Sequence, residues 1–125
     1  MASMTVYAAN AVLNGTGIPD TLYMDLHIGE PGINGTGNVA AGNVRTVCSR
    51  GAATGGVAHN DTTVSWVPYT ETEDITHGTF WDDPDFGQGN CWFIGELPSP
   101  VTVTDGEAAF FDIGDIEFEM ETYVP

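Results

Sequence analysis

The chain contains no lysine, and its only basic residues are Arg45 and Arg50. Phosphate binding needs clustered Lys or Arg side chains, so this lack excludes a nucleic-acid partner. It excludes an anionic membrane surface for the same reason. The sequence also has no apolar run near bilayer length and no basic-then-apolar signal at its start. We therefore expect a protein without nucleic-acid or membrane partners.

Cysteine is scarce as well. Cys48 and Cys91 are the two cysteines, and their spacing fits no zinc motif. Two alternatives stay open at this point. Both residues could be buried thiols that pack as small hydrophobic side chains, or they could form a disulfide between two strands.

Motifs for catalysis are absent too. There is no G-x-S-x-G turn, and no Ser or Cys stands beside an identifiable histidine partner. His27, His59 and His77 lack metal-ligand spacing such as H-x-x-x-H. Pairs of carboxylates carry no weight, because chance alone produces them in so acidic a chain. We therefore predict no enzymatic activity and no cofactor.

Acidic residues dominate what is present. The 125 residues include 18 Asp and Glu, which give a net charge of -16. In dilute buffer this charge destabilises the compact state through self-repulsion. In molar salt the Debye length falls to about 3 Å and most of the repulsion disappears. We interpret the composition as adaptation to the environment of an extreme halophile. The alternative is an acidic mesophilic protein loaded with calcium.

Three of these carboxylates are closely spaced. Asp82, Asp83 and Asp85 could hold a hard cation, although they lack the full calcium-loop pattern. A plain solvated turn is the alternative.

The length suits one domain over residues 1–125. A helix is predicted over about residues 3–14, with Ser3 as its N-cap and Gly15 as the residue that terminates it. Its expected apolar face consists of Met4, Tyr7, Ala8, Ala11 and Val12.

Alternation predicts about eight short strands. In the first, residues 21–28, every second side chain from Leu22 to Ile28 is expected to point inward, and Asp25 and His27 to point outward. Pro98 and Pro100 are expected to end a central strand, and Asp105–Gly106 is a hairpin signal. The other predicted strands are residues 44–49, 62–67, 75–81, 91–97, 101–104, 108–111 and 115–124.

In the last strand, Glu117, Glu119 and Glu121 alternate with inward residues. Residues 29–43 should form a long surface loop. One short helix and about eight strands indicate a mainly β protein, a single antiparallel β-sandwich.

Two sets of residues suggest surface chemistry. Asn14, Asn34 and Asn60 begin N-x-S/T sequons in predicted loops and are possible glycosylation sites. Four aromatic residues could stack on sugars or, alternatively, fill the core of a small sandwich. These are Tyr69, Trp81, Phe86 and Trp92.

The order of segments carries a resemblance. The relevant segments are AANAVLNG (8–15), IPDTLYMDLHIGEPG (18–32), NVRTVCS (43–49), VSWVP (64–68), ITHGTFWD (75–82), WFIGELPSPVTVTDGE (92–107) and FFDIGDIEFEME (110–121). In this order they resemble a family of small tail-fibre or minor virion proteins of tailed viruses. The family's usual D-P-G is Glu30-Pro31-Gly32 here, and its Tyr-Ala-Arg is Asn43-Val44-Arg45. The resemblance implies a β-sandwich virion component without catalysis.

From this resemblance we expect a structural virion protein of a tailed virus of an extreme halophile. It would be assembled in the host cytoplasm and exposed on the particle surface in high salt. We favour a homo-oligomer that decorates the capsid as a turret, tower or fibre base, in contact with the major capsid protein or with tail proteins. A tail fibre or tail-tip component, or a module that binds host-surface glycans, is the alternative. The predicted helix and first strand would anchor the protein, and loop 29–43 would face outward.

Overall fold

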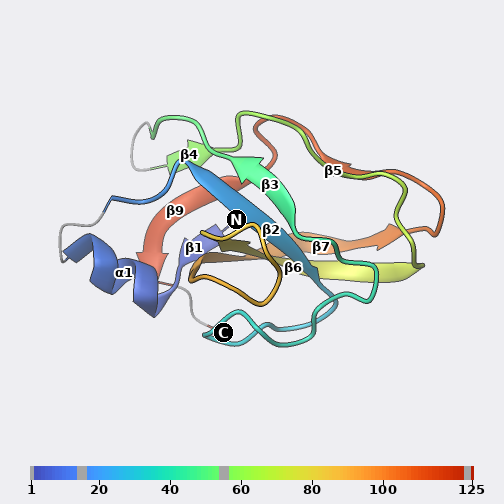
Figure 1. The fold of residues 1–125 in the computed structure, drawn as a ribbon, viewed down its shortest axis with the longest axis horizontal. Helices are drawn as coiled ribbons and strands as arrows, with labels where there is room; N and C mark the ends of the chain where they lie inside the picture. Colours follow the sequence, from blue (N-terminus) through green and yellow to red (C-terminus); the bar gives the residue numbers. More distant parts are fainter. Residues whose placement is uncertain (1, 14–16, 54–56, 123–124) are drawn as a thin grey trace.

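The computed structural model describes residues 2–13, 17–53, 57–122 and 125. These residues form one helix and nine strands (Figure 1). The elements are β1 (Ala2–Met4), α1 (Val6–Leu13), β2 (Thr21–His27), β3 (Thr46–Ser49), β4 (Val57–His59), β5 (Val64–Trp66), β6 (Glu73–Trp81), β7 (Cys91–Val103), β8 (Ala109–Phe111) and β9 (Glu117–Thr122). The mainly β class expected from the alternation is confirmed.

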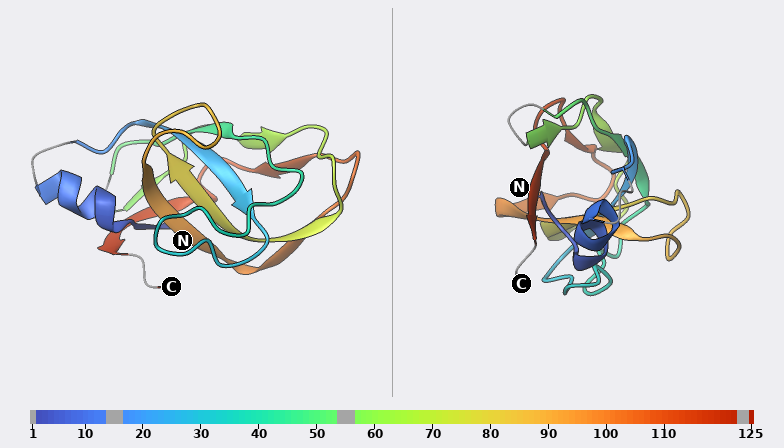
Figure 2. Two further views of the ribbon diagram at one scale, coloured as in Figure 1. Left: turned by 60° about the horizontal axis from the view of Figure 1, so that its bottom comes forward. Right: turned by 90° about the vertical axis from the view of Figure 1, so that its left-hand side faces the viewer.

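Seven strands form one sheet in the order β3-β2-β6-β7-β1-β9-β4, and β5 and β8 form a second, small sheet. The large sheet curls, and its two edges meet at an isolated bridge between Arg50 and Asn60. Beside this bridge, the Gly51 N–H donates to the His59 carbonyl at 2.8 Å. The strands therefore surround a common interior (Figure 2). The pairing of β1 with β9 is parallel, whereas the other described ladders are antiparallel.

The N-terminal segment differs from the prediction. Residues 2–4 form β1 between β7 and β9, and α1 begins only at Val6. The expected N-cap Ser3 is therefore wrong, and Thr5 takes this role. Its Oγ1 accepts a hydrogen bond from the Ala8 N–H at 3.1 Å, and its hydroxyl donates to the Cys91 carbonyl at 2.6 Å. Pairing on both sides outweighs the weak helical propensity of three residues.

The alternation in β2 holds for Leu22, Met24 and Leu26, which are buried. Two details of the prediction are wrong. Ile28 is exposed, and Asp25 and His27, which were expected to face solvent, are buried. Loop 29–43 folds back over β2, where it makes a bridge from Val39 to His27 and brings the Gly37 carbonyl to the His27 side chain.

The C-terminal half of β7 also differs. The strand continues through Pro98 and Pro100 to Val103, pairing with β6 on one side. In the described ladders β1 lies opposite only Phe93–Gly95, so the prolines lie where the strand has no ladder on its second side. Proline is tolerated at such an edge because the missing N–H is not needed there.

At Asp105–Gly106 the predicted turn is present, but the predicted hairpin is not. Gly106 has a φ of 84°, and the Glu107 N–H donates to the Thr104 carbonyl at 3.0 Å. The two flanking segments do not pair with each other. Instead β7 pairs with β6, and β8 pairs with β5 in the small sheet.

The sequence also missed β4, which pairs with β9 at the closing edge. In β9, Phe118 is buried and Glu117 and Glu119 are half-buried. Glu121 and Met120 lie outside the side chains that the structure describes. No helix among the described residues is long and apolar enough to cross a membrane.

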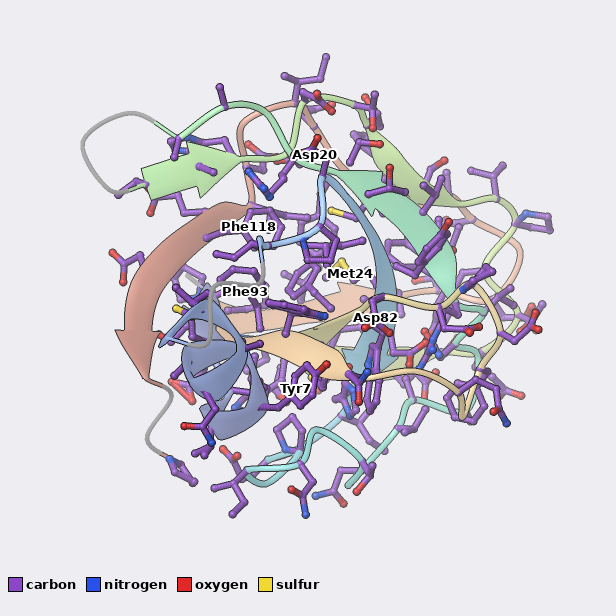
Figure 3. The ribbon with its side chains drawn as sticks, turned by 60° about the vertical axis from the view of Figure 1, so that its left-hand side comes forward. Tyr7, Asp20, Met24, Asp82, Phe93 and Phe118 are labelled. Carbon is purple, nitrogen blue, oxygen red and sulfur yellow. The ribbon has the colours of Figure 1, made fainter. Side chains whose placement is uncertain are left out.

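The core lies inside the curl. Phe80 of β6 and Phe93 of β7 both pack edge-on against Phe118 of β9, with ring centroids 4.9 and 5.0 Å apart. Met24 points into the same interior (Figure 3). This cluster joins β6, β7 and β9. Loops 29–43 and 82–90 extend from the framework that it stabilises.

Candidate functional site

A pocket of about 580 Å³ opens between three segments that are far apart in the sequence. We call it the loop pocket. It is lined by Thr5, Val6 and Tyr7 at the start of α1, by Ile33, Asn34, Gly35, Thr36 and Val39 of loop 29–43, by Phe86, Gly87, Gly89, Asn90 and Cys91 at the end of loop 82–90, and by Asp25, Arg45 and Trp81.

A buried ion pair forms one wall of the loop pocket. The Nε and Nη2 atoms of Arg45 both donate to Oδ2 of Asp25, at 3.1 and 2.8 Å. Each side chain is only 2% exposed. Asn43 completes the arrangement, since its Nδ2 donates to Asp25 Oδ1 at 2.9 Å and its Oδ1 accepts from the Leu26 N–H at 2.8 Å. A charge pair taken out of water needs such additional hydrogen bonds to be tolerated.

The Nη1 group of Arg45 holds loop 82–90. This nitrogen lies 3.1, 2.9 and 2.8 Å from three carbonyl oxygens of this loop. They belong to Asp83, Asp85 and Gln88. Arg45 therefore supplies the positive charge around which the loop folds.

Two rings flank the same guanidinium. The Cζ atom of Arg45 lies 4.6 Å from the ring centroid of Trp81 and 5.6 Å from that of Phe86. Both distances suit a cation–π contact. Trp81 is buried, whereas Phe86 is 58% exposed. The outer ring is thus held in place at the rim without being covered.

The three candidate cation ligands take part in the structure of this loop. Asp82 accepts hydrogen bonds from the Asn90 N–H at 2.7 Å and from Trp92 Nε1 at 3.1 Å. Burial acts to raise the pKa of Asp82, but these hydrogen bonds outweigh it and lower the pKa. Asp83 accepts from the Asp85 N–H at 2.8 Å. Among the described residues, no group of three or more His, Cys, Asp or Glu side chains is arranged to hold a metal ion.

A hydrogen-bond chain connects the pocket wall to loop 29–43. Trp81 Nε1 donates to Thr79 Oγ1 at 2.8 Å, and this hydroxyl lies 2.7 Å from His27 Nε2. His27 Nδ1 lies 2.7 Å from the Gly37 carbonyl, which can only accept. Neutral His27 therefore carries its proton on Nδ1 and accepts from Thr79 on Nε2. Burial lowers the pKa of His27 despite the bond to Gly37 and nearby carboxylates.

His77 lies opposite His27 in the β2–β6 ladder. Its Nδ1 is 2.8 Å from Thr76 Oγ1. Its buried Nε2 makes no hydrogen bond, but it lies 3.4 Å from one carboxylate oxygen each of Glu30 and Glu96. These close contacts connect the start of loop 29–43 to the β6–β7 pair. The third histidine, His59, lies on the surface 3.3 Å from Glu117.

The rim of the loop pocket is apolar and exposed. Val6, Tyr7, Ile33 and Phe86 are among the exposed large hydrophobic side chains of the protein. Tyr7, on α1 (Figure 3), packs edge-on against the buried Trp92 with centroids 5.5 Å apart. A rigidly supported apolar rim around a concave site is typical of ligand pockets.

The residues that line the pocket carry almost no charge, although loop 82–90 also contains Asp82, Asp83 and Asp85 outside the lining. Residues 1–19, 31–44 and 86–95 contain no Asp, Glu, Lys or Arg, although the chain has 20 such residues in total. Asp25 and Arg45, the charged side chains that line the pocket, neutralise each other. The loop pocket is thus an electrically neutral area on a strongly negative molecule.

Comparison with known proteins provides the family. The family model described as Podophage GP4 fiber I protein gp80 matches residues 3–119. The chain belongs to this family. The match runs from β1 into β9 and includes the whole loop pocket. A search of curated proteins found no match.

Membership of a phage fibre family supports the tail-fibre resemblance drawn from the order of segments, and it places the protein among structural virion components. It also suggests a role without catalysis. Decoration of the capsid and adaptation to a halophile are not tested by this match and stay predictions.

The predicted sugar-stacking residues divide in this fibre-family protein. Three of them, Tyr69, Trp81 and Trp92, are buried, which agrees with the alternative that these rings fill the core. Phe86 is exposed. The two cysteines lie on β3 and β7 and are free, buried thiols. Burial raises the pKa of both thiols to about 12, so they stay protonated and unreactive.

The three sequons also differ from each other. Asn14 lies outside the described residues. Asn34 is exposed at the rim of the loop pocket, and its modification stays a prediction. Asn60 is buried, against the expectation of an exposed loop residue. Its Nδ2 donates to the carbonyls of Thr62 and Asp112, both at 2.9 Å, so no N–H is free to carry a glycan in the folded protein.

Sequence reasoning missed the residues that build the site. Asp25 was assigned to a solvent-facing side, and Arg45 was noted only as one of the two basic residues and as part of the family resemblance. One signal was available. With two basic residues among 18 acids, an arginine that follows an uncharged segment of 14 residues is a strong candidate for an internal role.

Proposed function

We propose that the protein is a structural, fibre-type component of a virus particle and stands at the particle surface as a homo-oligomer. The observation that carries this proposal is the match of residues 3–119 to a phage fibre family. The family description favours a fibre or a fibre base over the turret or tower that we also considered for the capsid surface. Other virion proteins, of the tail or of the capsid, would hold it in place.

Mass spectrometry of purified particles tests the position. Particles of the encoding virus are separated into heads and tails, and the abundance of this chain is measured in each fraction. A fibre component accompanies the tail or the vertex from which fibres arise. Its absence from purified particles would contradict a virion role altogether.

A surface for self-association is available at the end of the molecule opposite α1. A groove of about 390 Å³ lies between β7 and β8, lined in part by Leu97, Val101 and Phe110. Val101 and Phe110 are exposed. Because each copy carries a charge of -16, copies can approach only where contact is apolar or salt screens the charge. We propose a second copy of this chain as the occupant of the groove.

Native mass spectrometry in concentrated volatile salt tests the oligomer. The wild-type protein should give a homo-oligomer, and Phe110→Asp should shift it to monomer. Ile113→Asp is the matched control, since Ile113 is similarly exposed but does not line the groove. A wild-type protein that is monomeric at all salt concentrations would refute the homo-oligomer.

A module that binds the host cell surface is the second candidate function. The observation that favours it is the loop pocket with its exposed aromatic rim. The two functions are compatible, because a component at the particle surface can also contact the cell.

A further inference from the structure

We propose that the loop pocket binds an uncharged saccharide unit. The proposal goes beyond a structural role and rests on the proposed position at the particle surface, where such a pocket meets cell-surface glycans. Its volume of about 580 Å³ lies within the range of roughly 300–1,000 Å³ that is usual for small-molecule sites.

The apolar part of the recognition comes from exposed aromatic rings on two separate elements. Phe86 stands on loop 82–90 and Tyr7 on α1, and both line the pocket. Each has a buried support, since Phe86 lies over the Arg45 guanidinium and Tyr7 packs edge-on against Trp92. The C–H face of a pyranose ring packs on aromatic faces, and rings already held in place lose little entropy on binding.

The polar part comes from uncharged groups in the same pocket lining. The side chains of Asn34 and Thr36 line the pocket and make no hydrogen bond within the described part of the chain. Asn90 uses its backbone N–H and its Nδ2 to hold Asp82, which leaves its side-chain oxygen for a ligand. Amide and hydroxyl groups of this kind suit the hydroxyls of a sugar.

Charge decides which saccharides are accepted. Arg45 offers no free positive charge to an anionic sugar, because its side chain is only 2% exposed and is paired with Asp25, and three loop carbonyls surround its Nη1. The molecule as a whole is strongly negative and repels anions at low salt. In molar salt this repulsion is screened, but an acidic sugar still meets no free cationic side chain in the pocket lining to compensate the desolvation of its carboxylates. The neutral lining imposes no such penalty on an uncharged ligand, so neutral sugars are favoured over acidic ones.

Calorimetric titration in molar KCl tests the proposal. The probes are three neutral oligosaccharides, namely chitotriose, cellotetraose and maltotetraose, and the acidic counterpart is trigalacturonate. At least one neutral probe should bind with a dissociation constant in the millimolar range or below, and trigalacturonate should not bind. Phe86→Ala should weaken the binding by about tenfold or more.

Phe110→Ala is the matched control. Phe110 has the same exposed fraction as Phe86, 58%, but lines the groove at the other end of the molecule. It should leave the affinity for a single oligosaccharide unchanged. Circular dichroism and thermal unfolding of each variant verify that the fold is retained.

Several results would overturn the proposal. These are the absence of binding for all neutral probes, equal binding of trigalacturonate, or equal losses in the two phenylalanine variants. If Phe86→Ala changed the oligomer mass and left sugar binding intact, the pocket would be a protein interface. None of these results bears on the presence of the chain in purified particles, so failure of this inference and failure of the virion role are distinguishable.

Discussion

At the scale of single residues, the two arginines have unequal roles. Arg45 is buried with Asp25 and holds a loop through three carbonyls. Arg50 bonds the carbonyls of Ile18 and Pro19, and its carboxylate partner Asp20 is almost fully exposed. A buried pair is costly to break because one charge is left without compensation, whereas an exposed pair contributes little.

Replacement of Arg45 should therefore be far more damaging than replacement of Arg50. We expect Arg45→Met to lower the free energy of unfolding by about 3–5 kcal/mol, and Arg50→Met by no more than about 2 kcal/mol. Urea denaturation at constant high KCl measures both. The double variant Arg45→Met/Asp25→Asn should recover part of the loss, because the unpaired carboxylate is gone. Equal losses in the two single variants would contradict the role given to Arg45.

His27 gives a prediction about pH. Burial lowers the pKa of His27 in the folded protein below its usual value of 6.5. Between that lowered pKa and 6.5 the unfolded chain binds a proton that the folded chain does not, so stability falls as pH falls through this window. Protonation would also turn Nε2 into a donor facing the Thr79 hydroxyl, which already accepts from Trp81.

Urea denaturation of the wild type and of His27→Gln at several pH values checks this dependence. The wild type should lose stability below pH 6.5, and His27→Gln should lose less over the same window. His59→Gln, which removes an exposed histidine, should behave as the wild type. Nitrogen-15 NMR of the imidazoles provides an independent check, since neutral His27 should carry its proton on Nδ1. A proton on Nε2 at neutral pH would contradict the hydrogen-bond chain.

At the scale of elements, loop 29–43 reaches the core framework at Gly35. This glycine has a φ of 74°, and a Cβ placed on it would lie 2.8 Å from Cys91 Sγ. Gly32 in the same loop has a φ of 79° but no atom within 4 Å of such a Cβ. A side chain at either position would therefore suffer the strain of a positive φ, but only at Gly35 would it also clash with a neighbouring side chain.

Gly35→Ala should consequently destabilise the protein more than Gly32→Ala. Both variants carry the cost of a left-handed residue, and Gly35→Ala adds overpacking of about 1–3 kcal/mol. The measurement is the difference between their free energies of unfolding in high salt. An equal loss in both variants would show that loop 29–43 does not pack tightly against Cys91.

Elements also show how far the sequence determines the fold. The alternation of Leu22, Met24 and Leu26 predicted β2, because an apolar residue at every second position indicates a strand with one buried face. β1 and β4 are three residues each and exist through pairing with distant strands, which no local pattern reveals. β2 alternates in sequence, but near its end it is covered on both faces, so its polar residues are buried as well. This is why Asp25, beneath loops 29–43 and 82–90, was assigned to solvent.

The site was predicted less well than the fold for the same reason. Loop 29–43 and Phe86 were recognised as surface features, but their meeting in one pocket depends on the curl of the sheet and on Arg45. The partition into an anchoring helix and an outward loop also needs revision, since Tyr7 of α1 and Asn34 of the loop line the same pocket. α1 and the loop therefore act on one side of the molecule.

At the scale of the whole molecule, the arginines are engaged in contacts within the fold, whereas most carboxylates lie on the surface. Arg45 and Arg50 both hold backbone carbonyls of their own chain. Most of the described carboxylates are exposed, and Asp25 alone among them is buried. The partly covered Arg50, which pairs with Asp20, is thus the one arginine near the surface to offset its acids, and the self-repulsion of the surface depends on the solvent.

Stability should therefore rise steeply with salt. We expect the melting temperature to increase with KCl and to level off above about 1 M, where the Debye length is about 3 Å. The expectation separates the halophilic interpretation from the calcium alternative, because monovalent salt screens charge without occupying a site. Thermal unfolding is recorded across KCl concentrations, once with EDTA and once with millimolar calcium. If the protein were equally stable at low salt in EDTA, the halophilic interpretation would be wrong. If calcium alone restored stability at low salt, specific cation binding would replace screening as the explanation.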